Sequence, residues 1–412
     1  MNPNLCAQRS LHSSMDARNL SCAPHLRITK MKWKVTLSDL NFDQGERRVV
    51  DRVIRSKWLT MGETVQRLER DFARFVGAKH AVAVSSGTAA LHLALIVLDL
   101  KPKDEVLVPA LSFVASSNAV LYIGATPVFV DISSLDDLNL SPDDVERKIT
   151  RRTKAIVIVH YGGYLADVEH IRKIARRHRL HLVEDSAHAV GASMNSRMAG
   201  TFGHIGCFSF FSNKNMATGE GGMLVTDDDG LARRLRLLRS HGMTSMTLSR
   251  HQGHAHTYDV VDLGFNYRMT EISAALGILQ LKKLKSGNRK RKALTDLYMS
   301  HLEGIRGLSI PFRDYQRGSA HHLFPIILDR GANREKFMQL LRQKGIQTSI
   351  HYPPIHTFSY YRRNFHGRKV RLPLTEQVGQ REVTLPLHPL LSKQDVVFVC
   401  NAVKEILPKV AK

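Results

Sequence analysis

A lysine stands where an apolar segment of the chain meets a glycine-rich loop. In "GCFSFFSNKNMATGEGGML", residues 206–224, the apolar run ends just before Lys214, and several glycines follow. Most lysines are solvated surface charges. A lysine beside a loop that lets backbone approach a ligand closely can instead hold a phosphate or form a Schiff base with a carbonyl group. The residue alone leaves these alternatives open.

Two other segments place polar groups where apolar runs end. In "SSGTAALHLAL", Gly87 permits a tight turn before a helical pattern, so the free amides there and the Thr88 hydroxyl can bind a phosphate. An ordinary helix N-cap is the alternative. In "LVEDSAHAVGA", Asp185 is either an N-cap or structural ion pair, or an anion that faces a cationic ligand nitrogen. His188 can reach the same pocket, although a lone histidine there is more often structural.

These groups form a set that one cofactor requires. Ser209, on the run that leads to the lysine, adds a hydroxyl for a phosphate. A phosphate cradle, a carboxylate for a ring nitrogen and a lysine amine are what pyridoxal 5′-phosphate needs, because its aldehyde bonds to the amine and its pyridine nitrogen needs an acidic partner. The combination is far more specific than any of its members.

The pattern of elements between about residues 63 and 285 predicts how these groups are positioned. Short β-rich runs alternate with Ala- and Leu-rich helical segments. This alternation predicts an α/β fold, with a largely parallel sheet covered by helices and ligands at the carboxyl ends of its strands. The expected strands are residues 80–86, 104–110, 126–132, 154–160, 180–186, 206–211 and 221–227.

The chain divides by pattern into three parts. Residues 1–34 are polar and basic, which predicts a disordered arm, or an extension ahead of a natural start at Met31. Residues 35–285 are expected to form a large cofactor-binding domain. From about residue 269 a long helical pattern leads into a mixed tail, so residues 286–412 are expected to form a smaller C-terminal α/β domain.

Composition excludes several classes of protein. No apolar run among the 412 residues approaches the roughly 20 needed to span a bilayer. The four cysteines lie far apart and suggest neither disulfides nor a zinc site, which favours a cytoplasmic protein.

The net charge of +23 is unaccompanied by a nucleic-acid-binding motif, so it favours anionic small substrates over DNA or RNA. The histidine-rich "HQGHAH" at residues 251–256 is interpreted as a loop, and no metal site is expected.

The longer motifs resemble the DegT/DnrJ/EryC1/StrS family of sugar aminotransferases, within the fold-type I (aspartate aminotransferase-like) pyridoxal-phosphate enzymes. The similarity extends over about residues 36–408. It is carried by a collinear series of segments: "SKWLTMGETVQRLERDFARFVGAKHAVAVSSGTAALHLAL", "VLVPALSFVASSNAVLYIGATPVFVDI", "VEDSAHAVGA", "CFSFFSNKNMATGEGGML", "LGFNYRMTEISAALG" and "HYPPIH".

The resemblance implies roles around the cofactor. Lys214 would form the Schiff base, and Asp185 would pair with the pyridine nitrogen. Phe113 would stack on the ring, although core packing is the alternative from the sequence itself. His188 would lie against the ring on its oxygen side. The implied phosphate ligands are Gly87, Thr88 and Ser209.

The resemblance also implies a second subunit and a substrate side. Asn266 would reach the phosphate bound by a neighbouring subunit, which implies a homodimer with a composite active site. Arg268, His351 and Tyr352 would face the substrate. For Asn266 and Arg268 an ordered surface turn is the alternative.

The implied reaction moves an amino group from glutamate or glutamine to a keto-sugar, most plausibly a nucleotide-linked 4-keto sugar, for amino-sugar or polysaccharide biosynthesis. Family members that dehydrate sugars carry histidine in place of the lysine, whereas Lys214 is present here. Another pyridoxal-phosphate reaction, such as dehydration, and a non-catalytic regulatory protein on the same fold remain alternatives.

Overall fold

A seven-stranded sheet forms the centre of the computed structural model, which describes residues 33–245, 253, 257–364 and 370–411. The strand order is β1-β9-β8-β5-β4-β2-β3. Strand β9 is antiparallel to both of its neighbours, and every other pair in this sheet is parallel. The strands are β1 (His80–Val84), β2 (Glu105–Pro109), β3 (Thr126–Val130), β4 (Thr153–Val159), β5 (His181–Asp185), β8 (Ile205–Ser209) and β9 (Gly222–Thr226).

The predicted α/β class and all seven expected strands are therefore confirmed, with ends that differ by at most two residues. The strands are almost wholly buried, as expected for strands covered on both faces. The expected arm lies outside the described residues except at positions 33 and 34, and so does most of "HQGHAH".

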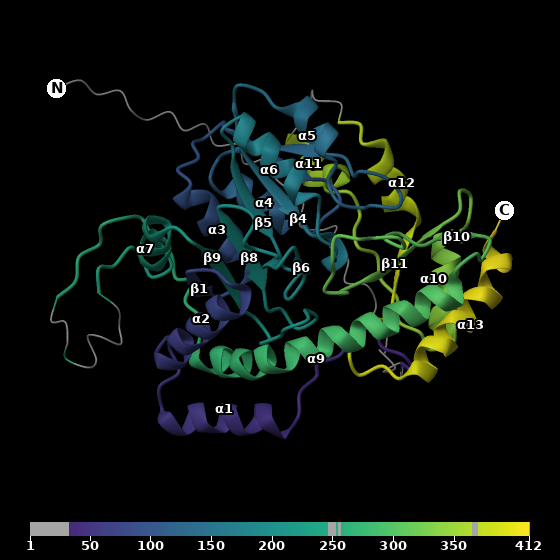
Figure 1. The fold of residues 1–412 in the computed structure, drawn as a ribbon, viewed down its shortest axis with the longest axis horizontal. Coiled ribbons are helices and arrows are strands. Elements are labelled where there is room, and N and C mark those ends of the chain that lie inside the picture. The colour runs from purple at the N-terminus through teal and green to yellow at the C-terminus, as the bar shows by residue number, and fades with distance from the viewer. Residues whose placement is uncertain (1–32, 246–252, 254–256, 365–369, 412) are drawn as a thin grey trace, which may run out of the picture.

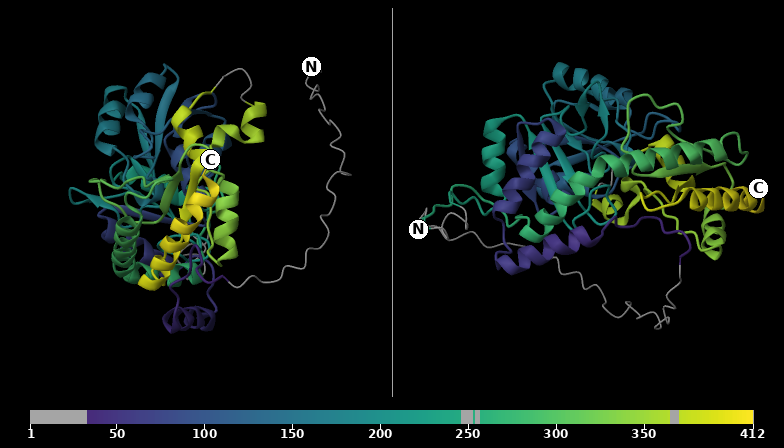
Figure 2. Two further views of the ribbon diagram at one scale, coloured as in Figure 1. Left: turned by 90° about the vertical axis from the view of Figure 1, so that its right-hand side faces the viewer. Right: turned by 60° about the horizontal axis from the view of Figure 1, so that its bottom comes forward.

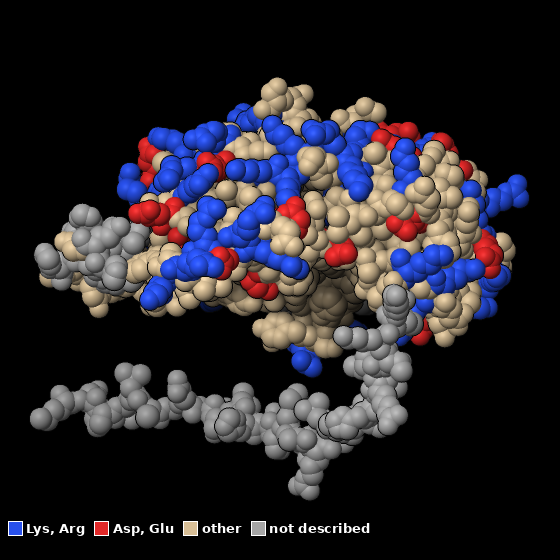
Figure 3. Space-filling model, turned by 90° about the horizontal axis from the view of Figure 1, so that it is seen from below, with Lys and Arg blue, Asp and Glu red and all other residues tan. Residues whose placement is uncertain are grey.

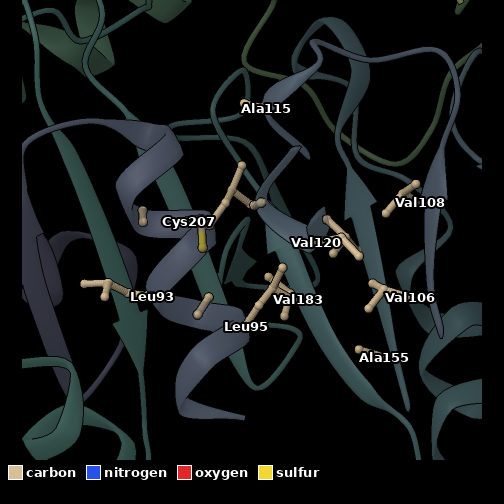
Figure 4. Close-up of a cluster of buried hydrophobic side chains, with 14 of the residues drawn as sticks. Leu93, Leu95, Val106, Val108, Ala115, Val120, Ala155, Val183 and Cys207 are labelled. Atoms are coloured by element: carbon tan, nitrogen blue, oxygen red, sulfur yellow. The ribbon is translucent and has the colours of Figure 1, made fainter. Parts of the chain in front are cut away.

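Helices cover both faces of this sheet (Figure 1). One face packs against α3 (Gly87–Val97), α4 (Ala115–Tyr122) and α7 (Asp229–Leu238). The other packs against α2 (Glu63–Val76), α5 (Pro142–Lys148), α6 (Val168–Arg177) and α9 (Glu271–Leu302). Figure 4 shows the first interface, where Leu95 of α3 and Val120 of α4 lie against Val183 and Cys207 of the sheet. The sheet thus forms the middle of three layers.

A smaller body follows the long helix. The strands β10 (Leu308–Ser309), β11 (Phe324–Leu328) and β12 (Glu382–Leu385) form an antiparallel sheet, packed with α10 (Arg334–Gln343) and α13 (Lys393–Val410) around a separate apolar core. Helix α9 is continuous from Glu271 to Leu302 and contacts both α2 and α13 (Figures 1 and 2). The expected domain boundary at residue 285 lies inside this helix and stays a prediction.

The remaining elements are short or lie at the periphery. Helix α1 (Gln44–Ser56) packs on α9. The others are η2 (Tyr161–Gly163), β6 (Ser193–Met194), β7 (Arg197–Met198), η3 (Ile355–Thr357), α11 (Ser359–Asn364) and α12 (Pro373–Arg381).

Basic side chains predominate on the surface that is seen from below, on the side of α1 and α9 (Figure 3). This agrees with the excess of 60 Lys and Arg over 37 Asp and Glu in the sequence. Among the described helices, none is long and apolar enough to cross a membrane.

Candidate active site

A pocket of about 480 Å³ lies at the carboxyl edge of the large sheet. The ends of β1, β5 and β8 meet there with segments from the smaller body, as expected for a ligand site in an open α/β sheet. Of the eleven residues singled out in the sequence, nine line this pocket: Gly87, Thr88, Phe113, Asp185, His188, Ser209, Lys214, His351 and Tyr352.

The N-terminus of α3 has free backbone amides that can bind an anion. Ser86 caps the helix by accepting a hydrogen bond from the Ala89 amide, which leaves earlier amides of the first turn free to face the pocket. A Cβ at Gly87 would lie 2.8 Å from Cβ of Ser209, so only glycine allows the helix to begin this close to β8. The Thr88 and Ser209 hydroxyls belong to the same end of the pocket.

The loop after β8 fixes the position of Lys214. Its backbone amide donates to the Phe211 carbonyl at 2.9 Å. The next side chain, Asn215, donates to Asn288 on α9 and to the Ala320 carbonyl, and it also contacts a ring nitrogen of His322 at 2.9 Å. The lysine therefore stands beside a residue that is held by two distant segments, α9 and residues 320–322.

Burial makes Lys214 a reactive amine. Loss of solvent lowers the pKa of Lys214 to about 8, and the negative charge of Asp185 partly opposes this shift. Among the described residues, the ammonium has no hydrogen-bond or ion-pair partner within bonding distance. A neutral lysine is the nucleophilic form, so this environment suits bond formation to an aldehyde.

Two defined contacts orient the carboxylate of Asp185. The Ser116 hydroxyl donates to Oδ2 at 2.7 Å, and the Ala187 amide donates to Oδ1 at 3.2 Å. Burial raises the pKa of Asp185, whereas the Ser116 hydrogen bond and the charge of Lys214 lower it. A cationic group bound in the pocket would hold this carboxylate in its ionised form.

Histidine and tyrosine side chains form the wall opposite the sheet. Nε2 of His188 lies 3.0 Å from the Tyr352 hydroxyl, and the two rings are stacked with centroids 6.0 Å apart. Burial lowers the pKa of His188 well below its usual range and that of His351 to about 4, so both rings are neutral at pH 7. Nδ1 of His351 contacts the Thr384 hydroxyl of β12 at 2.8 Å, which ties this wall to the smaller body.

Phe113 is 56% exposed although it lines the pocket. Its ring centroid lies 6.1 Å from that of Tyr352, at an interplanar angle of 56°. The alternative of core packing is therefore wrong for Phe113. An exposed aromatic face at the mouth of a pocket is available to cover a flat ligand.

Asn266 and Arg268 do not line this pocket. Asn266 is exposed and forms an isolated bridge with Ser240. The Arg268 guanidinium donates to the Ser240 hydroxyl at 3.1 Å. Within one chain both residues contact Ser240, and their expected roles, which require a second subunit or a substrate, stay predictions.

Three polar residues of the site were not singled out in the sequence. Ser116 and Asn215 act through hydrogen bonds to partners 69 and 73 or more positions away, a separation at which sequence pattern carries no signal. Asn213 directly precedes Lys214 in the quoted segment and lines the pocket. Its place next to the lysine was the sequence signal that could have identified it as a site residue.

The residues present fit pyridoxal 5′-phosphate. Nδ1 of His188 and Oδ1 of Asn213 are buried without a hydrogen-bond partner in the described structure, and both residues line the pocket. Buried polar atoms rarely stay unpaired, so a polar ligand is expected here. The anion site at α3, the carboxylate of Asp185 and the amine of Lys214 match the phosphate, the ring nitrogen and the aldehyde. The described residues contain no group of three or more acidic, His or Cys side chains that could hold a metal ion.

The lowered pKa of Lys214 predicts a pH dependence for the cofactor-free protein. With a pKa of about 8, roughly a tenth of the amine is neutral at pH 7, against well under a thousandth for an ordinary lysine. Reaction of Lys214 with an amine-acylating reagent should rise about tenfold from pH 6 to 7 and level off above about 8, as followed by peptide mass spectrometry. Lys173, exposed on α6, serves as the comparison. Identical profiles for the two lysines would contradict the effect of burial.

Comparison with known proteins also indicates an aminotransferase. The family model described as "DegT/DnrJ/EryC1/StrS aminotransferase family" matches residues 41–404. The spore coat polysaccharide biosynthesis protein SpsC of Bacillus subtilis is 40% identical over 363 residues, which are 87% of this chain and 93% of SpsC.

Solved structures share the fold. A putative sugar aminotransferase from Streptococcus pneumoniae, solved in its PLP form, superposes with a TM-score of 0.84 at 29% identity, covering 91% of this chain and 99% of that one. DesI, solved in the presence of its TDP-sugar product, superposes with a TM-score of 0.81 at 30% identity, covering 92% and 93%. The predicted fold-type I architecture is confirmed. This chain belongs to the DegT/DnrJ/EryC1/StrS aminotransferase family.

Proposed function

We propose that this protein is a pyridoxal-phosphate-dependent transaminase that moves an amino group from glutamate or glutamine to a nucleotide-linked keto-sugar. The observation that carries the proposal is the half-buried amine of Lys214, with its lowered pKa, in one pocket with the buried carboxylate of Asp185 and the anion site of α3. The likeness to sugar aminotransferases supports the sugar substrate, and the TDP-sugar of the DesI structure supports a nucleotide carrier.

The bound cofactor would supply an aldehyde that bonds reversibly to amines and a protonated ring that withdraws electrons from the substrate. The amides at the start of α3, with the hydroxyls of Thr88 and Ser209, would bind its phosphate. The carboxylate of Asp185 would hold the proton on the ring nitrogen. Phe113 would cover one face of the ring and exclude water from it.

Lys214 has two tasks in this scheme. Its Nζ would hold the cofactor between turnovers and would be freed when an amino donor binds. The freed Nζ would take a proton from the α-carbon of the donor and return it on the cofactor side, and it would move a proton in the opposite direction for the keto-sugar. His351 and Tyr352 line the same pocket and would face the substrates.

A homodimer would complete the site. Asn266 is exposed and available to the phosphate of a second subunit. Nearby in sequence, Tyr258, Val260, Val261 and Leu263 are 54% to 84% exposed, and apolar side chains exposed together favour a protein contact. These features support the composite site, with Arg268 on its substrate side.

The substrate proposal is tested with the cofactor-loaded protein, glutamate carrying isotope-labelled nitrogen, and a panel of nucleotide-linked 4-keto sugars. We expect labelled amino-sugar nucleotide and 2-oxoglutarate in equal amounts, read by mass spectrometry, with glutamine as the parallel donor. Loss of water from the sugar without amine transfer would favour a dehydratase. Protein that binds no cofactor and lacks the yellow absorbance would favour a regulatory role.

A further inference from the structure

A second pocket, of about 420 Å³, lies at the opposite end of β5 from the candidate active site. His181 at the start of this strand lines it, whereas Asp185 at the end of the strand lines the active site. Four residue steps along a strand separate the two by about 13 Å. The polar lining is entirely basic or imidazole, without an acidic side chain: Arg172, Arg176, Arg179, Arg197, His181 and His204.

Most of the positive charge in this pocket has no acidic partner. Arg172 pairs with Glu169 at 3.4 Å. Within the described part of the chain, Arg176, Arg179 and Arg197 form no ion pair, and Arg197 instead donates to the Thr201 carbonyl and lies 5.3 Å from the Phe202 ring. Guanidinium groups gathered without counter-charge repel one another, and a bound anion would remove this repulsion.

The two histidines add neutral donors to the lining of the pocket. Their rings lie 5.3 Å apart. Nδ1 of His204 accepts a hydrogen bond from the Leu182 amide at 3.0 Å, so the remaining nitrogen, Nε2, carries a hydrogen. Burial lowers the pKa of both His181 and His204, which keeps the rings neutral at pH 7. The pocket thus offers hydrogen-bond donors of two kinds.

Arg176 and Arg179 lie at the C-terminal end of α6, where they also offset the partial negative charge of the carbonyls, but the other two arginines do not. Arg176 lies in the last turn of α6, but Arg172 lies in its interior and Arg197 begins β7. Arg179 has a φ of 56°, a left-handed conformation that normally favours glycine or asparagine. A basic residue at this unfavourable position brings one more guanidinium to the pocket.

We propose that this pocket binds a phosphorylated small molecule through its phosphate groups. Guanidinium groups match phosphate oxygens in charge and planar geometry, and the pocket volume is within the range of small-molecule sites. The inference is independent of the reaction proposed for the other end of the strand.

Isothermal titration calorimetry on the cofactor-loaded protein tests this site, with inorganic pyrophosphate in one arm and UDP in the other. Titrations in about 0.15 M NaCl screen weak surface attraction, because the Debye length is then about 8 Å. The pocket variant is Arg176→Gln with Arg179→Gln. The matched control is Arg47→Gln with Arg48→Gln on α1, two exposed arginines that carry the same charge change outside the pocket.

We expect the pocket variant to bind at least about tenfold more weakly than wild type, and the control to stay within about twofold. Loss in the pyrophosphate arm alone identifies an inorganic ligand, loss in the UDP arm alone identifies a nucleotide, and loss in both arms identifies recognition of the shared diphosphate group; each supports the proposal. Equal affinities in the two variants would overturn it, as would no binding by wild type. A lower melting temperature of the pocket variant with unchanged anion affinity would also overturn it, because the arginines would then be structural. Amino-transfer rates should remain near wild type in both variants.

Discussion

Replacing Lys214 with alanine should lower amino transfer by about 10⁴-fold or more, because the variant loses both the covalent anchor for the cofactor and the group that moves the proton. Lys214→Arg should be equally inactive, since a guanidinium stays protonated and forms no Schiff base. Borohydride reduction followed by mass spectrometry gives a readout besides activity. Wild type should gain a cofactor covalently attached at Lys214, and neither variant should.

The fold should survive this substitution. The Lys214 side chain is half-buried at a desolvation cost, and the hydrogen bond to the Phe211 carbonyl comes from its backbone amide, which alanine retains. Cofactor-free Lys214→Ala should therefore melt at or above the wild-type temperature. The control is Lys173→Ala on the exposed side of α6, which should retain full activity. A Lys214→Ala protein that transfers amines at the wild-type rate would exclude the proposed role.

Asp185→Asn should be the next most severe change. Asparagine keeps the size of the side chain, and its oxygen can accept from the Ala187 amide while its NH₂ group donates to the Ser116 hydroxyl in place of the acceptor Oδ2. It carries no charge to hold a proton on the ring nitrogen. Removing one partner of a buried charge pair costs about 3–5 kcal/mol. At about 1.36 kcal/mol for each factor of ten, turnover should fall by about 10²- to 10⁴-fold.

A cofactor analogue methylated on the ring nitrogen gives a specific test of this role. Its fixed positive charge replaces the proton that Asp185 would hold, so it should restore much of the activity of Asp185→Asn while doing little for wild type. Ser116→Ala is the matched milder change, because it removes only one hydrogen bond to the carboxylate, and we expect a loss of about tenfold. An analogue that fails to improve Asp185→Asn would argue against a charge interaction at the ring nitrogen.

The sequence allowed the fold and much of the pocket to be predicted. Strands buried on both faces have a continuously apolar centre, so runs such as residues 104–110 and 154–160 are easily recognised. Asp185 directly ends such a run, and Gly87 and Lys214 follow others after a few residues; parallel topology brings these ends to one edge. Their meeting in one pocket followed from the fold class.

What escaped prediction depends on contacts between distant segments. Tyr352 meets His188 across 164 positions, and nothing in "HYPPIH" alone shows that its tyrosine faces a histidine of the large sheet. The basic pocket was also missed, because Arg197 joins the arginines of α6 only through the folding of a short hairpin. Arg268 looked like a substrate ligand, yet within one chain it bonds to Ser240.

The uninterrupted course of α9 has a consequence for attempts to divide the protein. Asn288 lies on this helix beyond residue 285, and it holds the side chain next to Lys214. A fragment that stops at residue 285 would lose this support together with the second half of the helix, so the amine would have no fixed place. Neither half of the chain should then catalyse amino transfer alone. Two co-expressed halves would regain activity only by associating with each other.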